Sequence, residues 1–155
     1  MKILRLVTGL ILLTVFVGCP QLDLGRLFGD EVARVASPDG RLEAILEETN
    51  GGATTSFGYV ACLVEKGHSP SESARVASFY GAVRSESAYG VNLVWLTSDE
   101  LELQYLKAKQ SQLIASSPVV GGSRISVRLR PGIGDPSAPS GGMLYNLDRL
   151  STGAK

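Results

Sequence analysis

The chain has 155 residues, equal numbers of acidic and basic side chains, and a formal net charge of zero. Because nucleic-acid-binding proteins usually carry a clustered positive surface, this balance argues against a nucleic-acid partner. Hydrophobic residues make up 44% of the chain and 18 residues are glycine, which argues against a disordered chain and favours one folded, loop-rich β domain.

The first 18 residues have the layout of an export signal. Lys2 and Arg5 form a positive start, an apolar stretch runs from Leu6 to Val17, and the small residue Gly18 follows. These three features are typical of a secretory signal peptide, and the apolar stretch is shorter than the ~20 residues that a membrane-spanning helix needs. We therefore expect residues 1–18 to be removed as a signal peptide.

The sequence Phe16-Val17-Gly18-Cys19 resembles the lipobox of bacterial lipoproteins. In that family the cysteine thiol receives a diacylglycerol and a peptidase cuts in front of it. The resemblance implies a lipid on Cys19, which anchors the chain to a membrane of the cell envelope because each buried CH₂ contributes about 0.8 kcal/mol. Pro20 stands where Asp would favour the inner membrane, so the resemblance favours the outer membrane, facing the periplasm, in a host with two membranes. The alternative is an ordinary secretory signal followed by an unmodified cysteine.

The mature chain is predicted to have three parts. Residues 19–30 form a lipid-anchored tether or a short helix, for which Asp23 is a candidate N-cap. Residues 31–150 form a β-rich domain, and residues 151–155 form a disordered tail. We expect an all-β fold, a small antiparallel sheet or sandwich of about six or seven strands. Residues 143–150 would close it as a short strand or helix.

Turn signals and alternating apolar residues define the expected strands. Ser37-Pro38-Asp39-Gly40 lies between two apolar segments and predicts a β-hairpin, in whose second strand Glu43, Glu47 and Glu48 keep one side in contact with water. Thr97 to Glu100 predicts a second hairpin. Residues 59–65 are apolar on both faces, which predicts a central strand covered on both sides.

The segment Ser123 to Arg130 has the clearest strand pattern. Ile125, Val127 and Leu129 are predicted to face the core, and the alternate residues to face solvent. The solvent-facing row contains Arg124, Arg128 and Arg130. This row is either a site for an anionic partner or the wet face of a sheet, paired with Glu43 and Glu47.

Two further resemblances are local. The Ser-Pro-Asp-Gly turn and the strand after it resemble the start of a blade in TolB-type β-propellers, and residues 95–103 resemble a second copy. The chain is too short to close a propeller of the usual 4–8 blades, so this resemblance implies blade-like hairpins only. Residues 50–57 and 135–142 resemble stretches of uncharacterised bacterial envelope proteins, which implies no activity.

The sequence contains no motif of a catalytic, metal or cofactor site. The single histidine, His68, lies in a Gly-His-Ser-Pro loop and is predicted to be solvated, and a metal site needs several ligands. There is neither a P-loop ending nor a nucleophile elbow. Cys62 lies in the two-sided apolar strand, which predicts a hidden thiol. If Cys19 carries no lipid, a bridge between Cys19 and Cys62 is the alternative.

Two long glycine-rich loops, residues 50–56 and 131–142, form the candidate binding surface. Long loops without secondary structure are usually functional or disordered. We expect both loops to be ordered and to lie against each other, with hydroxyl groups exposed and a basic residue at the border. The alternative is that the loops only brace one another. The candidate residues are Thr54, Thr55, Ser137, Ser140 and Arg130.

These patterns together predict a lipid-anchored envelope protein with a binding or structural role and no catalytic activity. Its partners would be the membrane, through the lipid on Cys19, and an envelope protein or glycan. Two alternatives remain, a hydrolase of envelope polymers and an inhibitor or immunity lipoprotein. A deep polar pocket with a strongly shifted titratable group would favour the enzyme, and an exposed apolar or single-sign patch would favour a protein partner.

Overall fold

The computed structural model describes residues 29–139, and this part of the chain is all-β. It contains ten strands and one turn of 3₁₀ helix, η2 (Glu72–Ala74). The signal peptide, Cys19, nearly all of the predicted tether, residues 143–150 and the predicted tail lie outside the described residues. In chain order the strands are β1 (Asp30–Ala36), β2 (Leu42–Asn50), β3 (Phe57–Glu65), β4 (Arg75–Tyr80), β5 (Asn92–Trp95), β6 (Glu100–Tyr105), β7 (Gln110–Leu113), β8 (Val119–Val120), β9 (Ser123–Arg124) and β10 (Ser126–Pro131).

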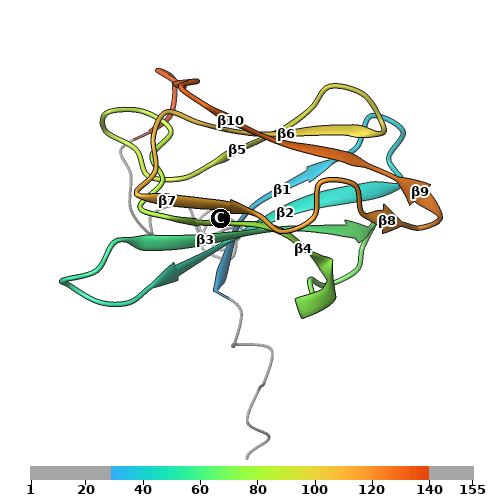
Figure 1. Ribbon diagram of the computed structural model, residues 1–155, viewed down its shortest axis with the longest axis horizontal. Coiled ribbons are helices and arrows are strands. Elements are labelled where there is room, and N and C mark those ends of the chain that lie inside the picture. The colour runs from blue at the N-terminus through green and yellow to red at the C-terminus, as the bar shows by residue number, and fades with distance from the viewer. Residues whose placement is uncertain (1–28, 140–155) are drawn as a thin grey trace, which may run out of the picture.

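The strands form a two-layer sandwich with a small additional ribbon. One sheet has five antiparallel strands in the order β1-β2-β3-β4-β7, and the other has three strands in the order β10-β6-β5. Strands β8 and β9 pair with each other as a two-stranded ribbon. In Figure 1 the three-stranded sheet lies above the five-stranded sheet. The predicted all-β sandwich is therefore confirmed, with more strands than expected.

Both predicted hairpins are present. At the first one, the Gly40 N–H donates to the Ser37 carbonyl at 2.8 Å, and β1 pairs with β2 on either side of the turn. Gly40 has a φ of 69°, a backbone conformation that suits glycine and strains a residue with a Cβ. The second hairpin joins β5 to β6, whose strands are antiparallel.

The core lies between the two sheets and follows the period-2 alternation of the strands. The residues of β2 and β3 that point toward the three-stranded sheet are buried, as are the facing residues of β5 and β6. Ile125 and Val127 are buried at 0% and 1% exposure, and Leu129 packs against the same core, as their alternation predicts. The largest buried contributors are Leu42, Leu46, Tyr59, Leu63, Val76, Phe79, Leu101, Leu103, Tyr105, Ile125 and Val127.

Strand β3 is central and buried on both faces, as predicted. On the face turned away from the core, Ile45, Cys62 and Val64 form a second buried cluster. Cys62 is a free thiol with 0% exposure, and burial raises its pKa to about 12. The prediction of a hidden thiol is therefore confirmed.

The three glutamates of β2 do not keep one side of the strand in contact with water, and this prediction is wrong. Glu43, Glu47 and Glu48 are all buried, with at most 9% exposure. Glu43 accepts hydrogen bonds from the Arg34 guanidinium at 2.6 Å and from the Gly67 N–H at 3.0 Å, which compensate for its lost hydration. Burial raises the pKa of Glu47, the other outward carboxylate.

The segment Ser123 to Arg130 is not one strand, because it is divided at Ile125 into β9 and β10. Strand β10 pairs with β6 in parallel, so Ser126 lies beside Glu100 and Arg130 beside Gln104. The arginine row therefore does not pair with Glu43 and Glu47. Instead, Arg128 lies 3.8 Å from Glu100 and Arg130 lies 3.4 Å from Glu102. The Arg128–Glu100 pair is exposed on both sides and contributes at most about 1 kcal/mol.

Candidate functional site

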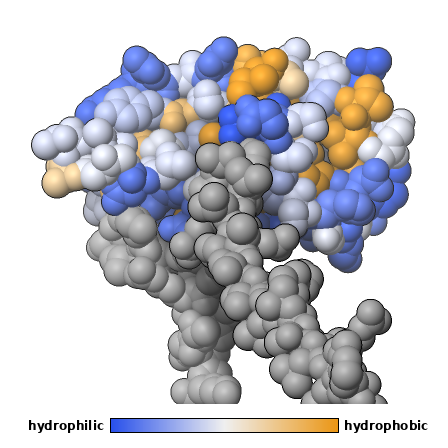
Figure 2. All heavy atoms as spheres, turned by 90° about the horizontal axis from the view of Figure 1, so that it is seen from below, coloured by the Kyte–Doolittle hydropathy of each residue, from blue (hydrophilic) through white to orange (hydrophobic). Residues whose placement is uncertain are grey.

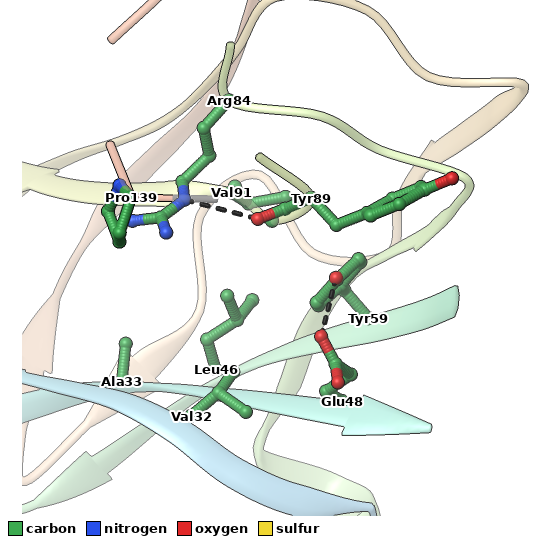
Figure 3. A pocket seen from close by; sticks show the side chains of 10 residues that line it. Val32, Ala33, Leu46, Glu48, Tyr59, Arg84, Tyr89, Val91 and Pro139 are labelled. Atoms are coloured by element: carbon green, nitrogen blue, oxygen red, sulfur yellow. Dashed lines mark hydrogen bonds between the residues drawn. The ribbon is translucent and has the colours of Figure 1, made fainter. Parts of the chain in front are cut away.

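A cavity of about 240 Å³ opens between the larger sheet and the segment 81–91, at the end of the sandwich where β2 finishes and β5 begins. Three neighbouring strands of the larger sheet form its lower wall in Figure 3, and the segment 81–91, which connects β4 to β5, forms the opposite wall. The lining is apolar in the middle and polar at two places. The lining residues are Val32, Ala33, Leu46, Glu48, Tyr59, Arg84, Tyr89, Gly90, Val91 and Pro139.

The first polar place is a buried pair formed by Glu48 and Tyr59. The Tyr59 hydroxyl donates to Glu48 Oε2 at 2.6 Å, and the two residues are only 7% and 1% exposed. Burial raises the pKa of Glu48, although the bond from Tyr59 acts in the opposite direction. Burial and the neighbouring carboxylate also raise the pKa of Tyr59 well above its usual value. The pair therefore places a carboxyl group, supported by one tyrosine hydroxyl, on the wall of the cavity.

The second polar place is Arg84, on the opposite wall (Figure 3). Its backbone is fixed because its N–H donates to the Ala88 carbonyl at 2.8 Å and its carbonyl accepts from the Asp135 N–H at 2.7 Å. Its guanidinium makes two long hydrogen bonds, 3.3 Å from Nε to the Tyr89 carbonyl and 3.4 Å from Nη1 to Asn92 Oδ1. No ion pair shown within residues 29–139 includes Arg84.

Gly90 permits this placement of the arginine. Its φ is 127°, and a Cβ built on it would lie 2.8 Å from Arg84 Nε. A side chain at this position would strain the backbone and would displace the guanidinium. Glycine at position 90 therefore leaves room for the Arg84 side chain to pass along the wall of the cavity.

The residues of the predicted binding surface do not line the cavity. Thr54 and Thr55 are exposed in the β2–β3 connection, where the Thr55 hydroxyl donates to the Gly52 carbonyl at 3.0 Å. Ser137 is exposed and donates to Asp135 Oδ1 at 2.6 Å. Arg130 is exposed at the end of β10. Ser140 lies outside the described residues, as does Cys19.

The two predicted loops both contact the segment 81–91. On one side, the rings of Phe57 and Tyr89 meet edge to face with centroids 4.9 Å apart, and the Gly81 N–H donates to the Phe57 carbonyl. On the other side, the Asp135 N–H donates to the Arg84 carbonyl. The contacts that the structure shows for the loops thus run through this third segment, whose importance the sequence analysis missed.

The sequence analysis also missed Glu48, Tyr59 and Arg84 as site residues. A signal for Glu48 was present, because the alternation Leu42, Ala44, Leu46 continues to position 48 and places this carboxylate on the core side. Tyr59 was placed correctly on one face of an apolar strand, but no partner was predicted for its hydroxyl. No local pattern marks Arg84: its bonds to Ala88, Tyr89 and Asn92 lie within a connecting segment without a recognisable motif, and its bond to Asp135 comes from a distant part of the chain.

No family model matches the chain, and no curated protein or solved structure is significantly similar to it. Function therefore has to be argued from the residues. Within residues 29–139, no three His, Cys, Asp or Glu side chains are grouped so that they could hold a metal ion. His68 is exposed in its loop, as expected. No helix in the described part of the chain is long and apolar enough to cross a membrane.

Proposed function

We propose that this chain is a lipid-anchored, non-catalytic binding protein of the bacterial envelope, which holds a small ligand in the cavity between its larger sheet and the segment 81–91. The observation that carries the binding role is the cavity itself, a concave and largely apolar space with a few polar groups directed into it. Ligand sites in proteins typically have this composition. The proposed anchor and envelope location rest on the sequence before the described residues, namely the signal-like segment and Cys19.

The size of the cavity limits the ligand. Its volume of about 240 Å³ lies below the roughly 300–1,000 Å³ of common small-molecule sites. The ligand is therefore small. On the face drawn in Figure 2, the coloured hydrophobic residues lie in separate groups among hydrophilic ones, and they do not form one broad apolar patch there.

One observation favours an enzyme as the second candidate. The pKa of Glu48 is raised inside a cavity, which is how many enzymes prepare a general acid or base. Hydrolysis of a glycan, however, usually needs two carboxyl groups on either side of the scissile bond. Glu48 is the only carboxylate among the described residues that line the cavity. Binding therefore fits the residues better than hydrolysis does.

A cavity-filling substitution tests the binding proposal. Ala33 lines the cavity from β1, and Ala36, at the exposed end of the same strand, is its matched control. Ligand-observed NMR with a library of small compounds, on the full-length chain purified in detergent, should detect binders for the wild type and Ala36→Phe. Ala33→Phe should lose them while remaining folded. Equal binding by both variants, or no binder for the wild type, would contradict the proposal.

A separate experiment tests the lipid anchor. The mature protein should partition with membranes and carry acyl mass on an N-terminal Cys19. The variant Cys19→Ala should lose both properties, whereas Cys62→Ala should keep them because Cys62 is buried in the domain. If Cys19→Ala protein is processed to the same size and still partitions with membranes, the lipoprotein proposal is wrong.

A further inference from the structure

The two polar places in the cavity carry opposite charge, and each lacks a full set of partners. Among residues 29–139, Tyr59 is the one residue shown to donate a hydrogen bond to Glu48, and it reaches Oε2 only. Glu48 lines the cavity, and no hydrogen bond shown within residues 29–139 ends on its Oε1. A carboxylate can accept bonds at both oxygens, so Glu48 has acceptor capacity left for a ligand.

The Arg84 guanidinium likewise has N–H donors left for a ligand. A guanidinium carries five N–H donors, and only two of them make the long bonds to the Tyr89 carbonyl and Asn92. The nearby acid Asp135 attracts the guanidinium through space, but its side-chain hydrogen bonds shown are to the Ser137 hydroxyl and N–H and to Asn92 Nδ2, and none joins it to Arg84. The guanidinium is therefore available to a carboxylate that enters the cavity, and a planar carboxylate can engage it through two parallel bonds.

Between these charges the wall is aliphatic. Figure 3 shows Leu46 and Val91 in the space between Glu48 on one wall and Arg84 on the other. A ligand with one charge would occupy the cavity and leave the opposite protein charge desolvated without a partner, which is unfavourable. A ligand with both charges satisfies both walls and stays neutral overall.

We infer that the cavity binds a small zwitterion, whose ammonium group meets Glu48 and whose carboxylate meets Arg84, with an aliphatic spacer lying over Leu46 and Val91. This inference rests on the proposed binding function and names the ligand class for that site. The volume of about 240 Å³ lies below the roughly 300–1,000 Å³ of common small-molecule sites. That space suits a single amino acid or a ω-amino acid, and it is too small for a peptide of several residues.

Isothermal titration calorimetry on the full-length chain tests the inference with four probes. The zwitterion ε-aminocaproate has spaced charges, and L-leucine is its isomer with adjacent charges. Hexylamine and hexanoate each keep one charge of the zwitterion on a similar aliphatic chain. We expect ε-aminocaproate to bind at least about tenfold more tightly than either singly charged probe. Tighter binding of L-leucine would overturn the spaced arrangement of the charges.

Three variants assign the charges. Glu48→Gln should reduce the affinity for ε-aminocaproate to that for hexanoate, and Arg84→Gln should reduce it to that for hexylamine. Arg130→Gln, at the exposed end of β10, should leave all four affinities unchanged. Gly90→Ala gives an independent check, because it displaces the guanidinium and keeps its charge. It should weaken hexanoate and ε-aminocaproate but not hexylamine.

The outcomes separate this inference from the proposed function. If hexylamine or hexanoate binds as tightly as the zwitterions, or if Glu48→Gln binds ε-aminocaproate normally, the inference is wrong and the cavity remains a binding site. If none of the four probes binds but the Ala33→Phe comparison detects other ligands, the inference is again wrong and the proposed function stands. If neither experiment detects a ligand, both are wrong.

Discussion

Replacing Tyr59 by Phe tests whether the buried carboxylate of Glu48 depends on one hydrogen bond. The ring is kept, so the change creates no large void, but Glu48 Oε2 loses the donor at 2.6 Å. A hydrogen bond to a charged group contributes about 1.5–3 kcal/mol, whereas one between neutral groups contributes about 0.5–1.5 kcal/mol. Because Glu48 is only 7% exposed, water does not readily replace the lost donor. We therefore expect a loss of about 1.5–3 kcal/mol at a pH where Glu48 is ionised.

The pH dependence of this loss identifies its cause. Without the tyrosine donor, the already raised pKa of Glu48 rises further in the folded state. The folded variant then binds more protons than the wild type, so its stability deficit grows as pH increases. At low pH, where the carboxyl is protonated, the deficit should fall to that of a neutral hydrogen bond, about 0.5–1.5 kcal/mol.

Urea unfolding near about pH 5 and about pH 8 measures both quantities. Tyr105→Phe is the matched control, because this tyrosine is 4% exposed and its hydroxyl donates to the neutral Ser111 hydroxyl at 3.0 Å. The control should lose about 0.5–1.5 kcal/mol equally at both pH values. If the two variants behave alike, or if the deficit of Tyr59→Phe does not change with pH, the account of Glu48 as a buried, tyrosine-supported carboxylate is wrong.

Three further predictions concern the core and the outer face of the larger sheet. Leu103 is fully buried at 0% exposure, so Leu103→Ala should lower the unfolding free energy by about 2–5 kcal/mol. Arg128→Ala should lower it by less than about 0.5 kcal/mol, and similar denaturation midpoints for the two variants would contradict the assignment of the buried and exposed faces. Cys62 should resist a maleimide in the native protein and react after denaturation, because it is fully buried and its pKa is about 12; rapid native labelling would show that this face is open. Burial raises the pKa of Glu47 in the folded state. The contribution of Glu47 to stability therefore declines as the pH rises above the pKa that this residue has in the unfolded chain. Glu47→Gln should remove that decline between about pH 4 and about pH 7. Glu43 has a lowered pKa, supported by the Gly67 N–H and Arg34. Glu43→Gln should therefore lose stability at neutral pH relative to acid pH, and the same sign for both variants in pH-resolved unfolding would refute the assignment.

Much of the fold was predictable because several strands carry strong local signals. The Ser-Pro-Asp-Gly turn, the two-sided apolar strand β3 and the alternation in β10 each follow from residue type and spacing. Strand β7 was not predictable in this way, since its four residues, Gln110 to Leu113, are exposed and mostly polar. It exists because it pairs with β4, and that neighbour is not adjacent in the sequence.

The glutamates of β2 show where the reasoning about polarity failed. A carboxylate is usually exposed, and this general preference was given more weight than the alternation that places Glu48 beside Leu46 on the core side. The structure resolves the conflict with specific partners, the Tyr59 hydroxyl for Glu48 and the Arg34 guanidinium for Glu43. Those partners come from β3 and β1, so their positions follow from strand register, which composition does not reveal.

The site was predictable only in part for the same reason. Sequence analysis directed attention to long glycine-rich loops, and these do contact the segment that builds one wall of the cavity. The residues that line the cavity come instead from strands β1 to β3, from residues 84–91 and from Pro139. Only the folded arrangement brings Arg84 opposite Glu48.

The parallel pairing of β6 with β10 sets the order in which folding is completed. Strands β1 to β4 pair with neighbours in the chain, so their hairpins form through short-range contacts. Strand β10 reaches β6 only after the intervening chain has supplied β7 to the other sheet, and closing such a long loop costs entropy before its contacts are made. Until then Leu101 and Leu103 lack one of their flanking strands. A chain that emerges N-terminus first therefore keeps one side of this core open until β10 arrives, and truncation before Ser126 should leave a collapsed, aggregation-prone intermediate.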